Sequence, residues 1–346
     1  MFPAEWYPQS GIMIAWPHPD TDWRENLADV EHVYCELVRQ VSEYEKVLLL
    51  CMDETLLFRV KGILDEYGIK DNRIDYRCVP YNDTWTRDFG PLSILKNGQP
   101  QLLNFQFNGW GNKFRSEQDN QVNHTLYAQG TWPGTCLHDI SYTLEGGSIE
   151  TDGCGTLLTT SACLLNKNRN GPLSRETVEK LLMKNLGINR VFWLEYGGLA
   201  GDDTDGHIDT LARFCDPETI AYMTCNNPGD ENYHGLSNME QELKDLRTKE
   251  GRPYTLIPLQ LPQPVYDRQG RRLPASYANF LITNGPILMP VYQDTMADQR
   301  AADQLAAAFP GREILTIDCK SLIVQHGSLH CMTMQITDKV LTRNSR

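Results

Sequence analysis

The chain has 346 residues, 40% of them hydrophobic, which is enough to bury a large core as one big domain or as two or three ordinary ones. Its formal net charge of −13 disfavours nucleic acids and anionic membranes as partners and suits a small cationic ligand. The sequence lacks an apolar run near the roughly 20 residues of a membrane span and the features of a signal peptide, and its ten cysteines lack zinc-site spacing, so we expect a metal-free cytoplasmic protein with reduced thiols.

The predicted elements, taken along the chain, recur in the order strand, turn, strand, helix, strand. The first copy is partial, with a strand at 12–17, a helix at 26–42 and a strand at 46–52. A looser copy over 91–142 turns at Asn97-Gly98. The three clear copies span 149–196, 210–259 and 278–319, and they turn at Asp152-Gly153, Asp216-Pro217 and Asn284-Gly285.

The helices of the clear copies have recognisable end signals. Ser174 is the predicted N-cap of the first, and Gly187 follows its last residue. A capping box, Ser237-x-x-Glu240, is predicted to open the second. The third is predicted to stop at Pro310-Gly311.

The turns of the clear copies recur about every 65 residues, a spacing typical of repeat architectures, and this period fits the chain about five times. A strand at 329–336 is left over, and pairing it beside the strand at 12–17 would close a ring. We therefore predict an α/β fold of five strand-strand-helix-strand units around a pseudo-fivefold axis, as a single domain over 1–346. The rival interpretation is an ordinary open α/β sheet, in which the terminal strand has no evident role.

Polar clusters stand just before, or on, the first strand of several predicted units. They lie at 82–91, 144–150, 201–214 and 327–331. If the units are related by rotation, side chains from these clusters meet near the centre of the ring, and they are Asp88, Glu145, His207, Asp209 and Cys331. The prediction is one site that combines a thiol, an imidazole and three carboxylates.

These residue types together suit chemistry on a guanidinium group. Its planar fork of N–H donors can be bound bidentately by carboxylates, and a thiolate can attack its carbon. His207 and Asp209 alternate on a predicted strand, so they would share one face. His330, next to Cys331, would point to the opposite face, so we do not expect it to activate the thiol. Attack by Cys331, loss of an amine and hydrolysis of the adduct would release ammonia.

Each feature also has an ordinary structural interpretation. A cysteine on an apolar strand is more often buried filler than a nucleophile, and a lone histidine is more often structural than catalytic. Asp88 could simply pair with Arg87, the glycines after Glu145 could form a bulge, and the acidic loop at 202–205 could be solvated. Their shared placement at the starts of predicted units is what favours a joint site.

The motifs resemble the agmatine deiminase and bacterial-type peptidylarginine deiminase family of the guanidine-modifying, or pentein, superfamily. The resemblance spans essentially the whole chain and rests on WTRDFGP, EGGSIETDG, TDGHIDTLARF and GSLHCMTMQ in that order. Each motif is modest alone, and the four together are quite specific. The family fold is a five-bladed α/β propeller, which agrees with the predicted repeat.

The resemblance implies a role for each residue of the predicted site. Cys331 would form a covalent thiouronium intermediate, and His207 would act first as general acid and then as base. Asp88 and Asp209 would hold the guanidinium nitrogens, and Glu145 would hydrogen-bond His207 or the substrate. It implies no metal or organic cofactor, and a homodimer. In one departure, the family's GGGNIHC is replaced here by QHGSLHC, which bears on the substrate rather than on the nucleophile.

Agmatine is the favoured substrate, because its amine tail calls for acidic or aromatic side chains and not for an arginine. The candidates for the tail are Trp16, Asp20, Trp85, Trp110, Asp202 and Asp203. A deiminase of free or peptidyl arginine would use an arginine near the mouth, for which Arg87 and Arg213 are available. An amidinotransferase and a non-catalytic polyamine-binding protein also fit the residue types. A cysteine peptidase is least favoured, because the carboxylates would repel its oxyanion.

Overall fold

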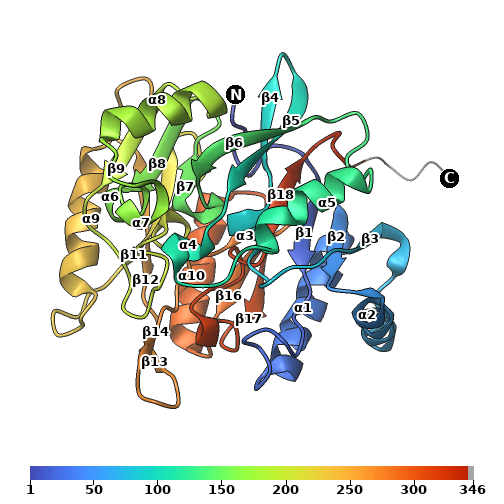
Figure 1. The fold of residues 1–346 in the computed structure, drawn as a ribbon. Coiled ribbons are helices and arrows are strands. Elements are labelled where there is room, and N and C mark those ends of the chain that lie inside the picture. The colour runs from blue at the N-terminus through green and yellow to red at the C-terminus, as the bar shows by residue number, and fades with distance from the viewer. Residues whose placement is uncertain (342–346) are drawn as a thin grey trace. The chain divides into compact units, whose positions relative to one another are not determined.

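The computed structural model describes residues 1–341, which fall into two compact units. Unit 1 comprises Met1–Trp6, Gly147–Ile282 and Pro286–His330. Unit 2 comprises Tyr7–Gly146, Thr283–Gly285 and the chain from Cys331 onward. Both units therefore contain segments from the beginning and the end of the chain, and Figure 1 labels their elements.

The first sheet of unit 2 joins the two ends of the chain. Its order is β18-β1-β2-β3, with β1 at Gln9–Ala15, β2 at Lys46–Cys51, β3 at Ile74–Cys78 and β18 at Met334–Thr337. The pairing of β1 is antiparallel with β18 and parallel with β2, and in Figure 1 the red β18 lies beside the blue β1. The predicted pairing of the terminal strand with the first strand is confirmed.

The remaining elements of unit 2 include a second sheet of order β4-β5-β6. Its strands are β4 at Leu92–Lys96, β5 at Gln99–Gln106 and β6 at Leu137–Thr143. The helices are α1 at Leu27–Ser42, α2 at Glu54–Glu66, α3 at Thr86–Phe89, α4 at Gly109–Asn112 and α5 at Val122–Ala128, with short 3₁₀ turns at Asp71–Arg73 and Asp119–Gln121. Helix α2 and strand β3 were not predicted, although Asp53 caps α2 by accepting a hydrogen bond from the Leu56 amide at 2.8 Å.

Unit 1 contains three sheets with one shared plan. Their strands are β7 (Ile149–Thr151), β8 (Thr156–Thr160) and β9 (Arg190–Leu194); β10 (Ala212–Asp216), β11 (Thr219–Thr224) and β12 (Thr255–Gln260); and β15 (Leu281–Ile282), β16 (Ile287–Val291) and β17 (Ile314–Asp318). In each sheet the first pair is antiparallel and the second is parallel. The second sheet of unit 2 follows the same rule. The predicted strand-strand-helix-strand order is therefore present in the sheets.

The helices of unit 1 return the chain between parallel strands. They are α6 (Ser161–Leu164), α7 (Lys167–Asn170), α8 (Arg175–Leu186), α9 (Tyr233–Asp245) and α10 (Thr295–Ala308), and a small hairpin pairs β13 (Val265–Tyr266) with β14 (Arg272–Leu273). The predicted ends of α8 are confirmed, because Ser174 caps the Thr177 amide and Gly187 has a left-handed φ of 67°.

The predicted start of α9 at Ser237 is wrong, since the helix begins one turn earlier at Tyr233. Leu236, Met239 and Leu243 form its buried stripe, and Leu236 can join that stripe only if the preceding turn is helical.

The cores of the sheets are apolar, and every residue of β8 and β11 is buried. All ten cysteines are thiols. Within residues 1–341, no helix combines the length and apolar character that crossing a bilayer requires.

Candidate functional site

In unit 2, Asp88 and Cys331 lie on two segments that are hydrogen-bonded to each other. Asp88 is on the short helix α3, and Cys331 is in the turn before β18. The Arg87 amide donates to the carbonyl oxygen of Cys331 at 3.2 Å, and the Thr86 hydroxyl donates to that of Met332 at 3.0 Å. Both Asp88 and Cys331 are buried. The segments that carry this thiol and this carboxylate are therefore held together by hydrogen bonds.

Glu145 reaches the same region because a glycine follows it. A Cβ atom on Gly146 would lie 2.2 Å from the carbonyl oxygen of Arg87, so only glycine permits this approach to α3. The Glu145 side chain is fully buried. The glycine therefore serves the backbone, as its ordinary interpretation holds, and in doing so it places a carboxylate beside the segment that carries Asp88.

Trp110 contacts the carboxylate of Asp88 directly. Its indole N–H donates to Asp88 Oδ2 at 2.9 Å. The residues Gly109–Asn112 have φ values of 63°, 55°, 85° and 65°, so four consecutive residues are left-handed. For Trp110 this conformation costs roughly 1–2 kcal/mol, and such strain is usually kept where it orients a side chain. Here it aims the indole N–H at Asp88.

The remaining tail candidates of unit 2 occupy different surroundings. Trp85 is buried and packs on Trp23, with ring centroids 5.5 Å apart. Trp16 is in the core, where its indole N–H donates to Glu31 at 3.0 Å. The Asp20 side chain is 83% exposed and pairs with Arg24. The structure therefore gives Trp16 a packing role and Asp20 a surface position.

A buried carboxylate, Asp119, holds the loop that leads to α3. Its Oδ1 accepts the backbone amides of Asn82 and Asp83 at 2.7 and 3.1 Å. Burial raises the pKa of Asp119 to about 8, and the nearby carboxylate of Asp83 adds to the rise against the lowering effect of the two amides. Above that pH the fold must keep a charge in an apolar setting.

We expect the stability of the wild type to fall more steeply between pH 6 and pH 9 than that of Asp119→Asn. A carboxyl whose pKa is raised on folding binds its proton more tightly in the native state, so stability is lost as the pH rises through the folded value. The asparagine oxygen can still accept both amides but does not titrate. Thermal unfolding midpoints measured across this range provide the test, and parallel curves for the two proteins would contradict the expectation.

In unit 1, His207 directly precedes a 3₁₀ turn, η4 at Ile208–Thr210, and Asp209 lies within it, so the two residues are not on a strand. The predicted strand was wrong because the Thr210 hydroxyl and the Thr210 amide both bond back to the carbonyl oxygen of His207, at 2.9 and 3.3 Å. The alternating pattern therefore did not place the two side chains on one strand face. Both are buried at the start of the segment that leads into β10.

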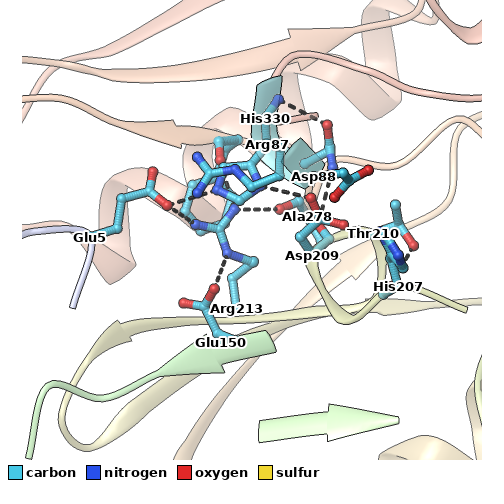
Figure 2. A network of polar contacts seen from close by, with 12 residues as sticks. Glu5, Arg87, Asp88, Glu150, His207, Asp209, Thr210, Arg213, Ala278 and His330 are labelled. Atoms are coloured by element: carbon cyan, nitrogen blue, oxygen red, sulfur yellow. Dashed lines mark hydrogen bonds and ion pairs between the residues drawn. The ribbon is translucent and has the colours of Figure 1, made fainter. Parts of the chain in front are cut away.

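Asp209 belongs to a chain of buried charges in unit 1, which Figure 2 shows from close by. His330 Nδ1 lies 2.8 Å from Asp209 Oδ2, and His330 Nε2 lies 2.7 Å from Glu5 Oε2. Arg213 donates to Glu5 and, through Nε at 2.8 Å, to Glu150. We call these five residues the charge cluster.

Electrostatics fix the charged state of two members of the charge cluster. Burial opposes ionisation of Asp209, yet the hydrogen bond from His330 and the nearby charges of His330, His207 and Arg213 hold its pKa below the usual range. Burial acts against the charge on Arg213, but the carboxylates of Glu150, Glu5 and Asp209 raise its pKa further. Asp209 is therefore a buried, ionised carboxylate.

The acidic loop before His207 is organised by its own side chains. Asp202 accepts from the Thr204 amide and hydroxyl at 3.1 and 2.6 Å and from the Gly206 amide at 2.7 Å. Asp203 is half-buried in the same loop. Asp202 thus shapes the turn that delivers His207, which is closer to the ordinary interpretation than to a binding role.

Three residues near these groups were missed by sequence reasoning. Asn279 is fully buried; its Nδ2 donates to the carbonyl oxygen of Asp209 at 3.3 Å, and its Oδ1 accepts the His330 amide at 2.9 Å. The Cys163 thiol lies within 4.8 Å of a ring nitrogen of His207. Glu5 lies 208 residues from Arg213, and a pair so distant leaves no local pattern in the sequence.

Comparison with known proteins gives consistent matches over nearly the whole chain. The model of the Porphyromonas-type peptidyl-arginine deiminase family matches residues 1–337. A Porphyromonas gingivalis structure, provisionally named an arginine deiminase, is 44% identical, with 99% of both chains covered and a TM-score of 0.91.

Two of the relatives named agmatine deiminase also match over nearly the whole chain. The C. jejuni enzyme, solved with substrate bound, is 39% identical, covers 97% of this chain and 95% of its own, and has a TM-score of 0.89. The Stutzerimonas stutzeri enzyme is 30% identical, with 96% of this chain and 94% of its own covered.

Proposed function

The chain belongs to the Porphyromonas-type peptidyl-arginine deiminase family, and from that membership we propose that it is an agmatine deiminase. Agmatine and water would give N-carbamoylputrescine and ammonia. The enzyme is a hydrolase that acts on a guanidino C–N bond, and its substrate is a small cation, in keeping with the net charge of −13.

Agmatine is favoured over arginine as the substrate because both candidate arginine side chains already make hydrogen bonds within the protein. Free arginine has a carboxylate, which a protein normally binds with an arginine fork. Arg213 is fully buried, and its guanidinium donates hydrogen bonds to Glu5, Glu150 and the carbonyl oxygen of Phe280. Arg87 is buried and donates to Gln335. Neither can turn to a substrate carboxylate without breaking a buried contact.

The proposed mechanism assigns one role to each predicted residue. Asp88 and Asp209 bind the guanidinium nitrogens, and the Cys331 thiolate attacks the guanidinium carbon. His207 donates a proton to the leaving nitrogen, and ammonia departs to leave a thiouronium adduct. His207 then takes a proton from water, which attacks the adduct and releases N-carbamoylputrescine and the thiolate. Glu145 supports His207 or the substrate by hydrogen bonding.

This mechanism requires groups of unit 1 and unit 2 to act on one substrate. The match of nearly the whole chain to relatives named agmatine deiminase supports that requirement. We also propose that the five sheets surround a pseudo-fivefold axis as a single domain over 1–346. The shared antiparallel-then-parallel pairing of the sheets supports the repeat.

The remaining expectations concern location and assembly. The ten thiols support a cytoplasmic location, where cysteines stay reduced. The excess of acidic residues supports a protein that binds neither nucleic acid nor anionic membranes. A homodimer is part of the proposal, and sedimentation of the purified protein tests it.

We expect the wild type to release ammonia from agmatine far faster than from arginine or from an arginine peptide with blocked ends. Agmatine would place an amine at the far end of the pocket, whereas arginine and the blocked peptide would place a carboxylate or an amide there. Ammonia release at matched concentrations measures the ratio. Faster turnover of arginine, the reaction suggested by the name of the Porphyromonas gingivalis relative, would keep the mechanism and overturn the substrate. Binding of agmatine without ammonia would overturn the enzyme assignment.

A further inference from the structure

The ring of His330 is bonded to a carboxylate at each of its nitrogens. Nδ1 lies 2.8 Å from Asp209 Oδ2, and Nε2 lies 2.7 Å from Glu5 Oε2. The three side chains are almost completely buried, and Figure 2 shows them together with Arg213. The catalytic scheme above gives His330 no role.

Counting protons decides the state of this ring. An ionised carboxylate only accepts hydrogen bonds, and a neutral imidazole has only one N–H. Two short contacts to carboxylates therefore require either a protonated carboxyl group or a doubly protonated ring. The structure indicates which of the two holds the proton.

Both oxygens of Glu5 are engaged as acceptors. Glu5 Oε1 accepts the Ile282 amide at 2.6 Å, and Glu5 Oε2 accepts a guanidinium N–H of Arg213. Neither oxygen of Glu5 is placed to carry a proton. The pKa of Asp209 is held below its usual range despite burial, so Asp209 is ionised as well. The second proton must then be on the ring of His330.

The charge count of the cluster agrees with that assignment. Glu5, Glu150 and Asp209 carry three negative charges, and Arg213 with a protonated His330 carries two positive ones. The charge cluster is then left with a net charge of −1. A neutral His330 would leave −2 in a buried setting, which is more costly before a substrate binds.

The backbone of His330 is fixed as firmly as its ring. Its amide donates to Oδ1 and to the carbonyl oxygen of Asn279 at 2.9 and 3.2 Å, and Asn279 Nδ2 contacts the carbonyl oxygen of Asp209 at 3.3 Å. With Asp209 Oδ2 held by the ring, the direction of Oδ1 is set too. A carboxylate fixed in this way can meet a planar guanidinium in only one orientation.

We propose that His330 is a positioning residue, held as an imidazolium between Glu5 and Asp209, which keeps the Asp209 carboxylate ionised and aimed at the substrate guanidinium. The aiming rests on the proposed function, whereas the doubly protonated ring does not. The arrangement also shows why the histidine beside Cys331 is not its base, since both ring nitrogens are already donating to carboxylates. The sequence analysis also excluded His330 as the base, but it did so by placing His330 and Cys331 on a strand, which the structure does not show.

The protonation state can be measured without any substrate. In protein labelled with ¹⁵N at histidine, we expect His330 to retain two ring N–H groups at pH 8.5, where an ordinary histidine, with a pKa of about 6.5, is neutral. His330→Asn identifies the signal by its loss. A neutral His330 tautomer at that pH overturns the proposal, whether or not the protein turns over agmatine.

Kinetics test the aiming of Asp209. For His330→Asn we expect kcat/KM for agmatine to fall about 10- to 100-fold, the usual effect of losing an orienting partner. The acidic limb of its pH profile should move to higher pH, because Asp209 loses a neighbouring positive charge and protonates more easily. A role in packing alone would lower activity without moving this limb, and that outcome overturns the proposal.

Two further variants sharpen the kinetic test. His138→Asn changes an exposed histidine on β6 and should leave both kcat/KM and the pH profile unchanged. In Glu5→Gln/His330→Asn, one negative and one positive charge are removed together, which restores the cluster to −1. We expect the acidic limb to return toward its wild-type position in this variant, and a limb that stays with the single variant contradicts the charge argument.

Discussion

Cys331→Ala is expected to release no measurable ammonia from agmatine, a loss on the order of 10⁴- to 10⁶-fold, as for other enzymes stripped of their nucleophile. The reason is that no other group in the proposed mechanism can form the thiouronium adduct. The side chain is small and buried, so its removal leaves a small cavity and the fold should survive. Ammonia release by wild type and variant, each checked for a cooperative unfolding transition, gives the measurement.

The matched control is Cys136→Ala, which changes an exposed thiol and should leave turnover unchanged. A haloacetamidine supplies a readout that does not depend on turnover, because it should label the wild type at Cys331 and leave Cys331→Ala unlabelled at that peptide. Residual turnover by Cys331→Ala within tenfold of the wild type would assign the nucleophile elsewhere, and the nearest candidate in unit 1 would be Cys163, beside His207.

Arg213→Met is expected to lower the free energy of unfolding by about 3–5 kcal/mol, the usual cost of removing one partner from a buried ion pair. Arg213 has no exposed surface and lies between Glu5 and Glu150, so the variant would leave two carboxylates buried without their cation. Urea unfolding followed by tryptophan fluorescence measures the loss.

An exposed pair in the same unit provides the contrast. Arg175 and Glu195 form an ion pair whose side chains are 44% and 45% exposed, so Arg175→Met should cost only about 0–1 kcal/mol. Replacing the whole buried group, as Glu5→Gln/Glu150→Gln/Arg213→Met, should recover part of the stability that Arg213→Met loses. Equal losses for Arg175→Met and Arg213→Met would show that burial of the charges does not set their contribution.

Local signals in the sequence were enough to predict most elements of the fold. Ser174 and Gly187 bound helix α8 as expected, because an N-cap oxygen and a left-handed glycine act within one turn of the chain. The turn at Asn97-Gly98 joins β4 to β5 for the same reason. The pairing of β18 with β1 is not local, and it was inferred only because the repeat left one strand over.

The errors arose where a contact distant in sequence overrides the local pattern. The strand at 329–336 was expected to include His330 and Cys331, but β18 begins at Met334, because the His330 amide bonds to Asn279 and not to a strand neighbour. The alternation of His207 and Asp209 suggested a strand. Nothing in the local sequence indicates that the Thr210 hydroxyl donates a hydrogen bond to the carbonyl oxygen of His207.

The sequence indicated which residue types make up the candidate site, but not the neighbouring residues that hold them in place. Asp88, Glu145 and Cys331 lie in unit 2, and His207 and Asp209 lie in unit 1. The charge cluster behind Asp209 was not foreseen, since Glu5 and His330 are 325 residues apart and either one alone looks like an ordinary residue. The left-handed turn at Trp110 was indicated in the sequence only by the glycines on both sides of it, Gly109 and Gly111.

The dependence of both units on the two ends of the chain has a consequence for synthesis. In unit 2 the Ser10 hydroxyl donates to the carbonyl oxygen of Thr337, which is 327 residues later. In unit 1 Glu5 contacts His330, which is 325 residues later. At roughly 5–20 residues per second, the ribosome needs on the order of tens of seconds to bridge that gap. Strand β1 and the Glu5 carboxylate therefore leave the exit tunnel long before their partners exist. Neither unit can complete its core until residues 330–337 have been synthesised, and the nascent chain must keep an open strand edge covered until then.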